Sequence, residues 1–547
     1  MDMEKNEGQT RRTFLKGAGS ALAAGAAASL MSGAGAAMAD ENLPAWDYEA
    51  DFVVVGAGTG MTGALAAAVD GCSVIVLECS GITGGTMAAS GGVSYVPCNS
   101  LEAAEGIEDT REMARTYLVA CAEGQASDEI IDAYLDRASE MADFVQEHSP
   151  LTWMISDFRR CYEYHPEWEG AVFRGRSLYP ADGENPPERR GYLLAQHLTQ
   201  GIEDAGGQIL LNTKATRLIT RPQEDGTPEI IGVHAEGPDG EINVKAAKGV
   251  LLAAGGYDYD EEMKTAFLRI PTLYSNAAKG CDGTGVKMAM AVGAALTNMN
   301  ECWGYPAYKA PGEMGYFQGF DHQEPGKIVV NRYGERFMNE GGDYDSLWRG
   351  FSAFNTWNNQ DDFGWRNLPA FTIMDDAARR RYGMAYKYGD EYPEWAVCAD
   401  TLRELAEKLG IDPDGLEATV ERFNQYAEDG YDPEFHRGES LYDRLWNQKG
   451  EGIPGPEESL GALTTPPFWG AEVCAGTLGT CGGAKVNANA QVVNAFGEVI
   501  PRLYCAGNNS GVGSPGAGYT GGGATIGPAM TFAYIAGRHA ATLDAWE

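Results

Sequence analysis

Closely spaced glycines follow a short apolar run near the start of the chain, and an acidic residue stands about twenty positions further on. The run is Asp51–Val55, the glycines are Gly56, Gly58 and Gly60, and the acidic residue is Glu78. Gly56 permits a tight turn, Gly58 lets a pyrophosphate approach the backbone, and the N–H groups of a following helix bind the anion. Glu78 is placed to accept hydrogen bonds from a ribose. This spacing predicts a dinucleotide site.

Three further glycine-rich segments indicate which dinucleotide is bound. One follows Glu78, the second follows an apolar run that reaches Ala253, and the third lies near the C-terminus. Small residues there let a bulky ring system pass close to the backbone, and an NAD site needs only the first such turn. We therefore expect FAD as the cofactor, and no metal. The expected cofactor contacts in and around these segments are Gly84, Gly85, Thr86, Ser90, Gly91, Gly92, Ala254, Gly255, Gly256, Asp282, Gly507, Asn508, Ala524, Thr525 and Ile526.

The elements around the first turn are predicted as a strand, a helix and a strand. Asp51–Val55 is apolar and β-branched, which is typical of a buried parallel strand, and the alanine-rich segment Gly63–Val69 predicts a helix. Ser73–Leu77 predicts the next strand, with Glu78 at its end. The order is that of a βαβ unit. Met61 stands where the fingerprint has its third glycine, so we expect a helix start displaced by one residue.

The composition changes along the chain and predicts its domains. Residues 303–467 are rich in Trp, Tyr, Asp and Asn and lack glycine-rich phosphate turns, which return after them, and a helix near 526–545 closes the chain. We expect an α/β fold with a Rossmann-like FAD-binding domain in two parts, 47–302 and 468–547. Residues 303–467 are then an inserted α+β domain that caps the cofactor and carries catalytic residues.

The N-terminal segment, residues 1–39, has the pattern of a twin-arginine signal peptide. Thr10–Lys16 contains two adjacent arginines, and the Ala/Gly-rich run Ala18–Met38 ends in the cleavage pattern Ala37–Ala39 before Asp40. The many small residues make this run only weakly hydrophobic, which favours a signal peptide over a membrane anchor. The twin-arginine route carries folded proteins, so we expect export to the periplasm, the cell surface or the medium with the cofactor already inserted.

Charge and cysteine content narrow the partners. The formal net charge of −37 disfavours nucleic acid and anionic lipid as partners. The 11 cysteines form no CxxC or CxxCH motif, so no haem or iron–sulfur group is predicted in the chain. No soluble nicotinamide pool is expected outside the cytoplasm. We therefore expect a separate membrane or secreted electron-transfer partner, or a diffusible acceptor.

Several segments carry a resemblance to a known family. The chain resembles the superfamily of FAD-dependent 3-ketosteroid Δ1-dehydrogenases and fumarate reductase flavoproteins over nearly all of residues 50–545, and is most similar to the dehydrogenase branch. The most specific match is Gly518–Phe532, with the sequence GYTGGGATIGPAMTF. Thr477–Gly483 and Arg336–Glu340 also fit, as does Tyr164-His165-Pro166 followed by Gly175-Arg176-Ser177.

The resemblance implies removal or addition of two hydrogens at a C–C bond beside a carbonyl, one as a proton and one as a hydride. The Tyr519 hydroxyl and the Gly523 backbone N–H would donate to the carbonyl oxygen, which gains negative charge as the proton departs. A glycine at 523 would leave room for the substrate. Tyr344 would handle the proton and, because a phenol has a pKa near 10, would need help from Tyr164 or Tyr162. The helix that opens near Gly523 would stabilise the reduced flavin.

Three functions stay open at this point. The first is an oxidoreductase that acts on an enone or a ketosteroid-like substrate, in either direction. The second is a respiratory reductase of the fumarate or acrylate type, acting on cinnamate or urocanate, for which Arg332, Arg336 and Arg349 are candidate carboxylate ligands. The third is a flavin electron carrier without C–C chemistry.

Overall fold

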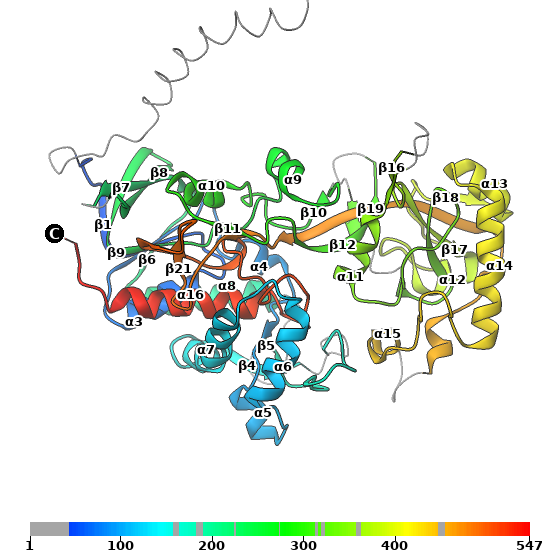
Figure 1. Cartoon of the computed structure of the whole chain (residues 1–547), viewed down its shortest axis with the longest axis horizontal. Helices are drawn as coiled ribbons and strands as arrows, with labels where there is room; N and C mark the ends of the chain where they lie inside the picture. Colours follow the sequence, from blue (N-terminus) through cyan, green and yellow to red (C-terminus); the bar gives the residue numbers. More distant parts are fainter. Residues whose placement is uncertain are drawn as a thin grey trace, which may run out of the picture.

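Figure 1 shows the computed structural model of the chain, which describes residues 43–156, 163–181, 190–223, 226–272, 274–311, 316–318, 323–356, 363–446 and 455–546. The expected signal peptide and Tyr162 lie outside these residues. Two β-sheets lie at opposite ends of the long axis in Figure 1, and the C-terminus lies at the end of the first sheet. Within the described residues no helix combines the length and the apolar character needed to cross a membrane.

The first sheet contains the predicted βαβ unit. Its order is β21-β22-β9-β1-β2-β6, with β7 and β8 attached to β9 as an antiparallel hairpin. All central pairs are parallel, and β21 alone on this path is antiparallel. The central strands are apolar on both faces because helices cover the sheet. The strands are β1 (Tyr48–Val55), β2 (Val74–Leu77), β6 (Gln208–Leu210), β7 (Lys214–Pro222), β8 (Pro228–Gly237), β9 (Gly240–Leu252), β21 (Gln491–Val493) and β22 (Val499–Cys505).

The helix after the first turn explains the departure at Met61. Helix α3 (Met61–Val69) begins at that residue, two positions before the predicted start, and packs against α16 (Ile526–Ala541). A Cβ atom at Gly63 would lie 2.5 Å from the Ala533 carbonyl oxygen, and one at Gly537 would lie 2.2 Å from that of Gly63. The glycine displaced to position 63 therefore serves the contact between α3 and α16.

Other helices surround the first sheet. Helices α6 and α7 form a pair below it in Figure 1, and α7 packs on α16. A three-stranded sheet, β3-β5-β4, lies on the same side and passes under the start of α16. These elements are α4 (Gly85–Ala89), α5 (Ser100–Glu105), α6 (Arg111–Ala122), α7 (Asp128–Glu147), α8 (Arg190–Asp204), α9 (Glu261–Phe267), α10 (Thr284–Ala291), β3 (Ser94–Tyr95), β4 (Thr152–Ile155) and β5 (Ser177–Ala181).

The second sheet is mainly antiparallel and has the order β13-β12-β19-β17-β14, with β10 and β18 attached to β19. Two helices, α13 (Leu402–Leu409) and α14 (Pro413–Asp429), bury their apolar faces against it in a separate core. Its strands are β10 (Tyr274–Ser275), β12 (Cys302–Lys309), β13 (Tyr316–Gln318), β14 (Lys327–Asn331), β17 (Ala370–Asp375), β18 (Val397–Ala399) and β19 (Phe468–Thr480). The other elements of this part are α11 (Tyr344–Arg349), α12 (Asp376–Tyr382), α15 (Leu441–Trp446), β15 (Phe354–Asn355) and β16 (Gly364–Trp365).

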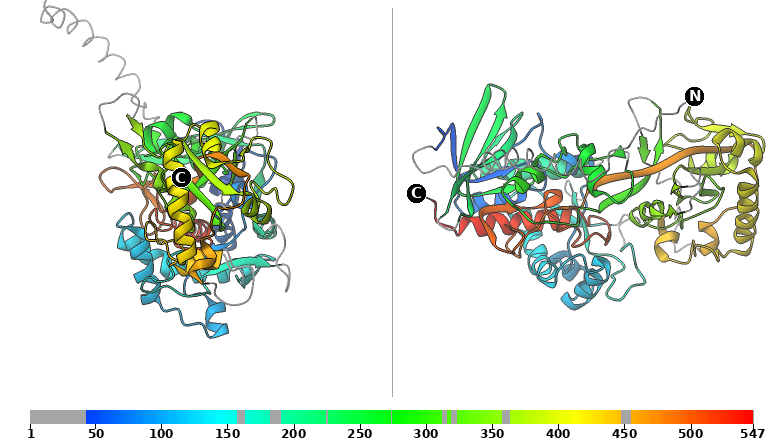
Figure 2. Two further views of the ribbon diagram at one scale, coloured as in Figure 1. Left: turned by 90° about the vertical axis from the view of Figure 1, so that its right-hand side faces the viewer. Right: turned by 45° about the horizontal axis from the view of Figure 1, so that its top comes forward.

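The sheets confirm an α/β fold with a Rossmann-like part and an α+β insertion, but they correct one expectation. Strand β19, which we assigned to the second part of the FAD-binding domain, pairs with β12 and β17 in the second sheet (Figure 2). The composition changes at 467 because β19 is flanked by strands on both sides and is rich in small residues. A Cβ atom at Gly476, for instance, would lie 2.9 Å from the Tyr305 ring. The domain boundaries themselves stay a prediction.

Candidate active site

A cavity of about 1350 Å³ lies between the carboxyl end of the first sheet and the second sheet. It begins at the turn after β1 and reaches residues of α11 and of the loop before α16. The predicted tyrosines, Gly523 and most of the predicted cofactor contacts line it. The exceptions are Gly60, Gly256, Gly507 and Ala524.

Two of these exceptions are glycines that other parts of the protein require. A Cβ atom at Gly60 would lie 2.6 Å from that of Ala253, and one at Gly256 would lie 1.9 Å from the Thr480 hydroxyl oxygen. Gly60 therefore allows close packing of the turn on β9, and Gly256 allows close packing on β19. We assigned both to the cofactor, but the structure gives them a packing role instead.

The first two fingerprint glycines have different surroundings. Gly56 has a φ of +102°, and a Cβ atom there would lie 2.4 Å from the Ala253 carbonyl oxygen. At Gly58 the nearest atom to such a Cβ would be the Gly84 carbonyl oxygen, at 3.6 Å, and Gly58 lines the cavity. Gly56 is thus required by the chain itself, whereas Gly58 leaves open space where a pyrophosphate would meet the backbone.

Glu78 lies at the end of β2, where the fingerprint requires it. The side chain is buried, and its two carboxylate oxygens accept hydrogen bonds from the backbone N–H groups of Ala57, at 2.8 Å, and Ser80, at 2.9 Å. Each oxygen keeps a lone pair for a further donor, and Glu78 lines the cavity. The carboxylate is therefore fixed in place to accept hydrogen bonds from ribose hydroxyls. We call the part of the cavity around Gly58 and Glu78 the dinucleotide end.

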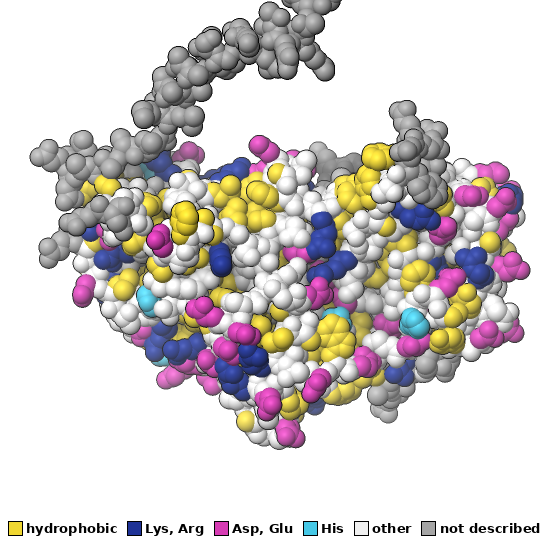
Figure 3. All heavy atoms as spheres, in the orientation of Figure 1, with side chains coloured by type: hydrophobic (Ala, Val, Ile, Leu, Met, Phe, Trp, Pro, Cys, Tyr) yellow, Lys and Arg dark blue, Asp and Glu magenta, His cyan; other side chains and the backbone are white. Residues whose placement is uncertain are grey.

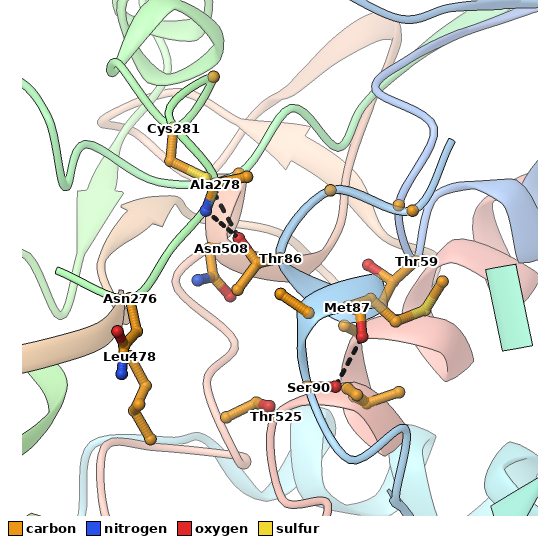
Figure 4. A pocket seen from close by; sticks show the side chains of 18 of the residues that line it. Thr59, Thr86, Met87, Ser90, Asn276, Ala278, Cys281, Leu478, Asn508 and Thr525 are labelled. Atoms are coloured by element: carbon orange, nitrogen blue, oxygen red, sulfur yellow. Dashed lines mark hydrogen bonds between the residues drawn. The ribbon is translucent and has the colours of Figure 1, made fainter. Parts of the chain in front are cut away.

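Polar side chains from separate segments meet in the middle of the cavity, as Figure 4 shows. Thr86 accepts a hydrogen bond from the Ala278 N–H at 2.9 Å, and Asn508 and Thr525 lie across from it. Among the described residues, none accepts a hydrogen bond from the N–H groups of Thr525 and Ile526, which open α16. These groups and the positive end of the helix dipole suit an electron-rich ring edge.

Three tyrosines meet at the other end of the cavity, which we call the tyrosine end. Tyr164 and Tyr519 stack with ring centroids 5.2 Å apart and planes 11° apart, and Tyr344 lies edge-on to both. The Tyr164 and Tyr344 hydroxyls form a hydrogen bond at 3.2 Å. All three side chains are buried and line the cavity. The structure thus brings together residues that stand far apart in the sequence.

Local structure fixes Tyr344. It is the first residue of α11, where the Asp343 side chain caps the helix by accepting hydrogen bonds from two backbone N–H groups. The helix lies close to β12 because Gly304 has no side chain, and a Cβ atom there would lie 1.9 Å from the Trp348 ring. The Gly304 N–H also donates to Asp345 at 3.1 Å. The second sheet therefore presents Tyr344 to the cavity at a fixed position.

The surroundings of Tyr344 favour its neutral form. Burial raises its pKa well above the ordinary value, and Tyr164 and Tyr519 raise it further, each also through a hydrogen bond. Without substrate, Tyr344 is therefore a protonated phenol that can donate a proton. Removing a proton from substrate requires the neighbouring hydroxyls to support the phenolate.

Gly523 has a different reason to be glycine from the one we expected. Its φ is +89°, and a Cβ atom would lie 2.6 Å from the Tyr95 backbone nitrogen in β3. The glycine therefore accommodates β3 rather than the substrate. Its own N–H donates to no described residue, and Gly523 lines the cavity, so this N–H remains suited to a substrate carbonyl.

The three arginines considered for carboxylate binding are not among the residues that line the cavity. Arg336 is buried and pairs with Glu340 at 2.7 Å and Asp432 at 2.9 Å. Arg332 donates to the Tyr333 hydroxyl at 2.8 Å. The remaining one, Arg349, donates to the Ala517 carbonyl oxygen at 3.2 Å and pairs with Asp345. Their contacts assign them to other parts of the protein.

Sequence reasoning missed several residues near the tyrosine end. Tyr442 packs against Tyr164 with centroids 4.9 Å apart, and no motif pointed to it. Trp303 and Leu478 line the cavity beside the tyrosines, and three tyrosines that follow α12 in the second part, Tyr382, Tyr386 and Tyr388, also line it. Only their position in the folded chain connects these residues with the site.

Comparisons with known proteins agree with this geometry. Residues 51–526 match a family described as an FAD binding domain. The 3-oxosteroid 1-dehydrogenase of Mycobacterium tuberculosis is 35% identical, over 90% of this chain and 98% of its own length. For the 4-oxocyclohexanecarboxylate 2-dehydrogenase of Sinomonas cyclohexanicum the identity is 32%, over 89% and 92%.

Among solved structures, a 3-ketosteroid Δ1-dehydrogenase from Sterolibacterium denitrificans in complex with 1,4-androstadiene-3,17-dione has a TM-score of 0.81 and 29% identity. The match covers 90% of this chain and 99% of that one. The fit of the dinucleotide end to FAD and the extent of these matches lead to one assignment. The chain belongs to the FAD-binding domain family and is an FAD-dependent oxidoreductase related to the 3-oxosteroid 1-dehydrogenases.

Proposed function

We propose that this enzyme adds or removes two hydrogens at the C–C bond next to the carbonyl of a ring ketone. The observation that carries the proposal is the meeting of Tyr164, Tyr344 and Tyr519 in the same cavity as the dinucleotide turn. The two relatives named above share an oxo group on a six-membered ring, which supports a ring ketone of the enone or ketosteroid type.

The protein groups divide the work at the carbonyl and at the carbon beside it. The Tyr519 hydroxyl and the Gly523 N–H donate to the carbonyl oxygen and stabilise its negative charge when the neighbouring carbon loses a proton. The Tyr344 hydroxyl exchanges that proton, and Tyr164 supports it through the bond between their hydroxyls. FAD, held at Gly58 and Glu78, supplies the two-electron chemistry and exchanges the hydride with the next carbon.

The two alternative functions have less support. A fumarate or acrylate-type reductase needs cations at the substrate, and Arg332, Arg336 and Arg349 all have partners away from the cavity lining. A flavin electron carrier without C–C chemistry has no use for three buried hydroxyls at one end of its cofactor cavity. Both alternatives remain outcomes of the experiment below.

The experiment is steady-state turnover by the purified, FAD-loaded protein in both directions. Oxidation is measured with an artificial electron acceptor on the 1,2-dihydro form of 1,4-androstadiene-3,17-dione and on 4-oxocyclohexanecarboxylate. Reduction is measured with a reduced dye on the corresponding enones, and on cinnamate and urocanate. Turnover of a ketone and not of the acrylates is expected. Turnover of the acrylates alone would favour the reductase alternative, and no turnover at all would favour the electron carrier.

We also propose that the enzyme is exported and exchanges electrons with a separate membrane or secreted protein. The twin-arginine pattern and the absence of haem or iron–sulfur motifs in the sequence support this. Fractionation of the native cells should find the FAD-containing protein outside the cytoplasm, without residues 1–39. A change of Arg11 and Arg12 to Lys should retain it inside, and a full-length cytoplasmic protein would contradict the proposal.

A further inference from the structure

A buried ion cluster lies directly behind the tyrosine end and takes no part in the proposed chemistry. Arg176 forms a hydrogen bond with Glu163 at 3.0 Å and contacts both oxygens of Asp109, at 2.6 and 2.9 Å. Tyr95 donates its hydroxyl to the Glu163 carboxylate at 2.8 Å. The Arg176 and Glu163 side chains are each only 2% exposed. Glu163 is the residue before Tyr164 in the sequence.

The backbone at Glu163 and Tyr164 is tied to the loop that carries Tyr519. Tyr164 donates its N–H to the Thr520 carbonyl oxygen at 3.0 Å, and Glu163 forms an antiparallel bridge with Gly521. From the other side, Ser177 donates its hydroxyl to the Gly522 carbonyl oxygen at 2.7 Å. The segments around 164, 177 and 520 are therefore joined into one unit.

We propose that Glu163 is a positioning residue, which Arg176 and Tyr95 hold in place and which aims the Tyr164 hydroxyl at Tyr344. Buried ion pairs contribute little net stability, because removing the charges from water offsets their attraction. What the cluster does supply is direction. Five hydrogen bonds of 2.6–3.0 Å fix the Glu163 side chain and its partners, and the next residue along the backbone is Tyr164.

This inference rests on the proposed function, and a double-mutant cycle between E163Q and Y164F tests it. E163Q keeps the shape of the side chain and removes its charge. If Glu163 acts through the Tyr164 hydroxyl, E163Q should lower kcat by about tenfold to hundredfold, with KM changed by less than about threefold. In the Y164F background the same change should lower kcat by less than about threefold, because the positioned group is already absent.

A matched control is available two residues from Arg176. Arg174 pairs with Glu105 on the surface, where both side chains are more than two-fifths exposed. R174Q should leave kcat within about twofold of wild type, as expected for a surface ion pair. FAD content and the thermal midpoint, measured for every variant, separate loss of positioning from loss of folding.

Additive effects of E163Q and Y164F, or an E163Q enzyme with wild-type kcat, would overturn the proposal. If E163Q does not fold, Y95F enters the same cycle, because it removes one donor to Glu163 and leaves the ion pairs intact. A crystal structure of the chosen variant gives a readout that needs no substrate. The Tyr164 hydroxyl should lie beyond hydrogen-bond distance of Tyr344, and an unchanged position would contradict the proposal. If wild type turns over no ketone, the proposed function fails, while this structural readout still tests the positioning role.

Discussion

The dinucleotide end of the cavity is built largely from residues that are close in the sequence, whereas the tyrosine end is built from side chains of three distant segments. Gly58 and Glu78 lie within one βαβ unit and act through a bare backbone and a strand end. Tyr164, Tyr344 and Tyr519 come from a loop, a helix of the second part and a loop of the first. Binding of the cofactor thus depends on local geometry, and chemistry depends on how the two parts meet.

The comparison extends to the solvent. Acidic and basic side chains are interspersed over both parts on the face in Figure 3, where the net charge of −37 is spread rather than concentrated. The charges near the tyrosine end behave differently, because they are buried and paired. The two ends should therefore respond differently to substitution, and the following predictions are ordered from the largest expected effect to the smallest.

Gly58→Val should abolish FAD binding. A Cβ atom at Gly58 meets no protein atom closer than 3.6 Å, so the added side chain occupies cavity space that the pyrophosphate needs. The apoprotein should keep its circular dichroism spectrum and lose the yellow colour. Gly60→Val is the contrasting change, because its side chain meets Ala253 and should disturb folding itself. A yellow Gly58→Val protein would show that the dinucleotide end is misassigned.

Tyr344→Phe should lower turnover by about a hundredfold to ten-thousandfold, the usual range for loss of a general acid–base group. Hydrogen exchange at the substrate carbon beside the carbonyl, followed by NMR in D₂O, should stop. A phenolate that mimics the enolate should still perturb the flavin spectrum, because the Tyr519 hydroxyl and the Gly523 N–H remain. Exchange at the wild-type rate would assign the proton to another group.

Tyr519→Phe should lower turnover by about a hundredfold to a thousandfold, as is typical when one donor to a developing oxyanion is removed. FAD content should not change, since the ring and its stacking on Tyr164 are kept. The phenolate complex should weaken, in contrast to Tyr344→Phe. Turnover within a few-fold of wild type would remove the carbonyl-binding role and make the acrylate-reductase alternative the better one.

Tyr386→Ala should have the smallest effect, and only on large substrates. Tyr386 lines the cavity, yet it is 60% exposed, and with Ala385 it forms a turn in which both residues have positive φ. An aromatic contact of this kind contributes about 0.5–1.5 kcal/mol, so KM for a steroid should rise by about two- to tenfold, and that for a single-ring ketone should not. Tyr392→Ala is the control, because Tyr392 is 49% exposed and packs on Trp469. Equal effects on both substrates would exclude a contact with the remote rings.

The sequence by itself predicted the dinucleotide end well, because that end depends on short-range rules. A strand, a turn at Gly56, a helix and an acidic residue at 78 are set by side-chain size and spacing over about thirty positions. The α/β class and FAD followed from the same patterns. Even here the reasons were partly hidden, since Gly60, Gly256 and Gly523 are glycines because β9, β19 and β3 approach them.

Only the tertiary structure decided the tyrosine end and the membership of β19. The chain has 26 tyrosines, and no short-range rule distinguishes Tyr442 or Tyr386 from the rest. Tyr164, Tyr344 and Tyr519 could be named from a family resemblance, but their stacking and hydrogen bond depend on the contact between the two parts. Strand β19 joined the second sheet because its partners β12 and β17 lie far away in sequence. Such contacts close long loops, and the pattern of any one segment does not encode where its partner stands.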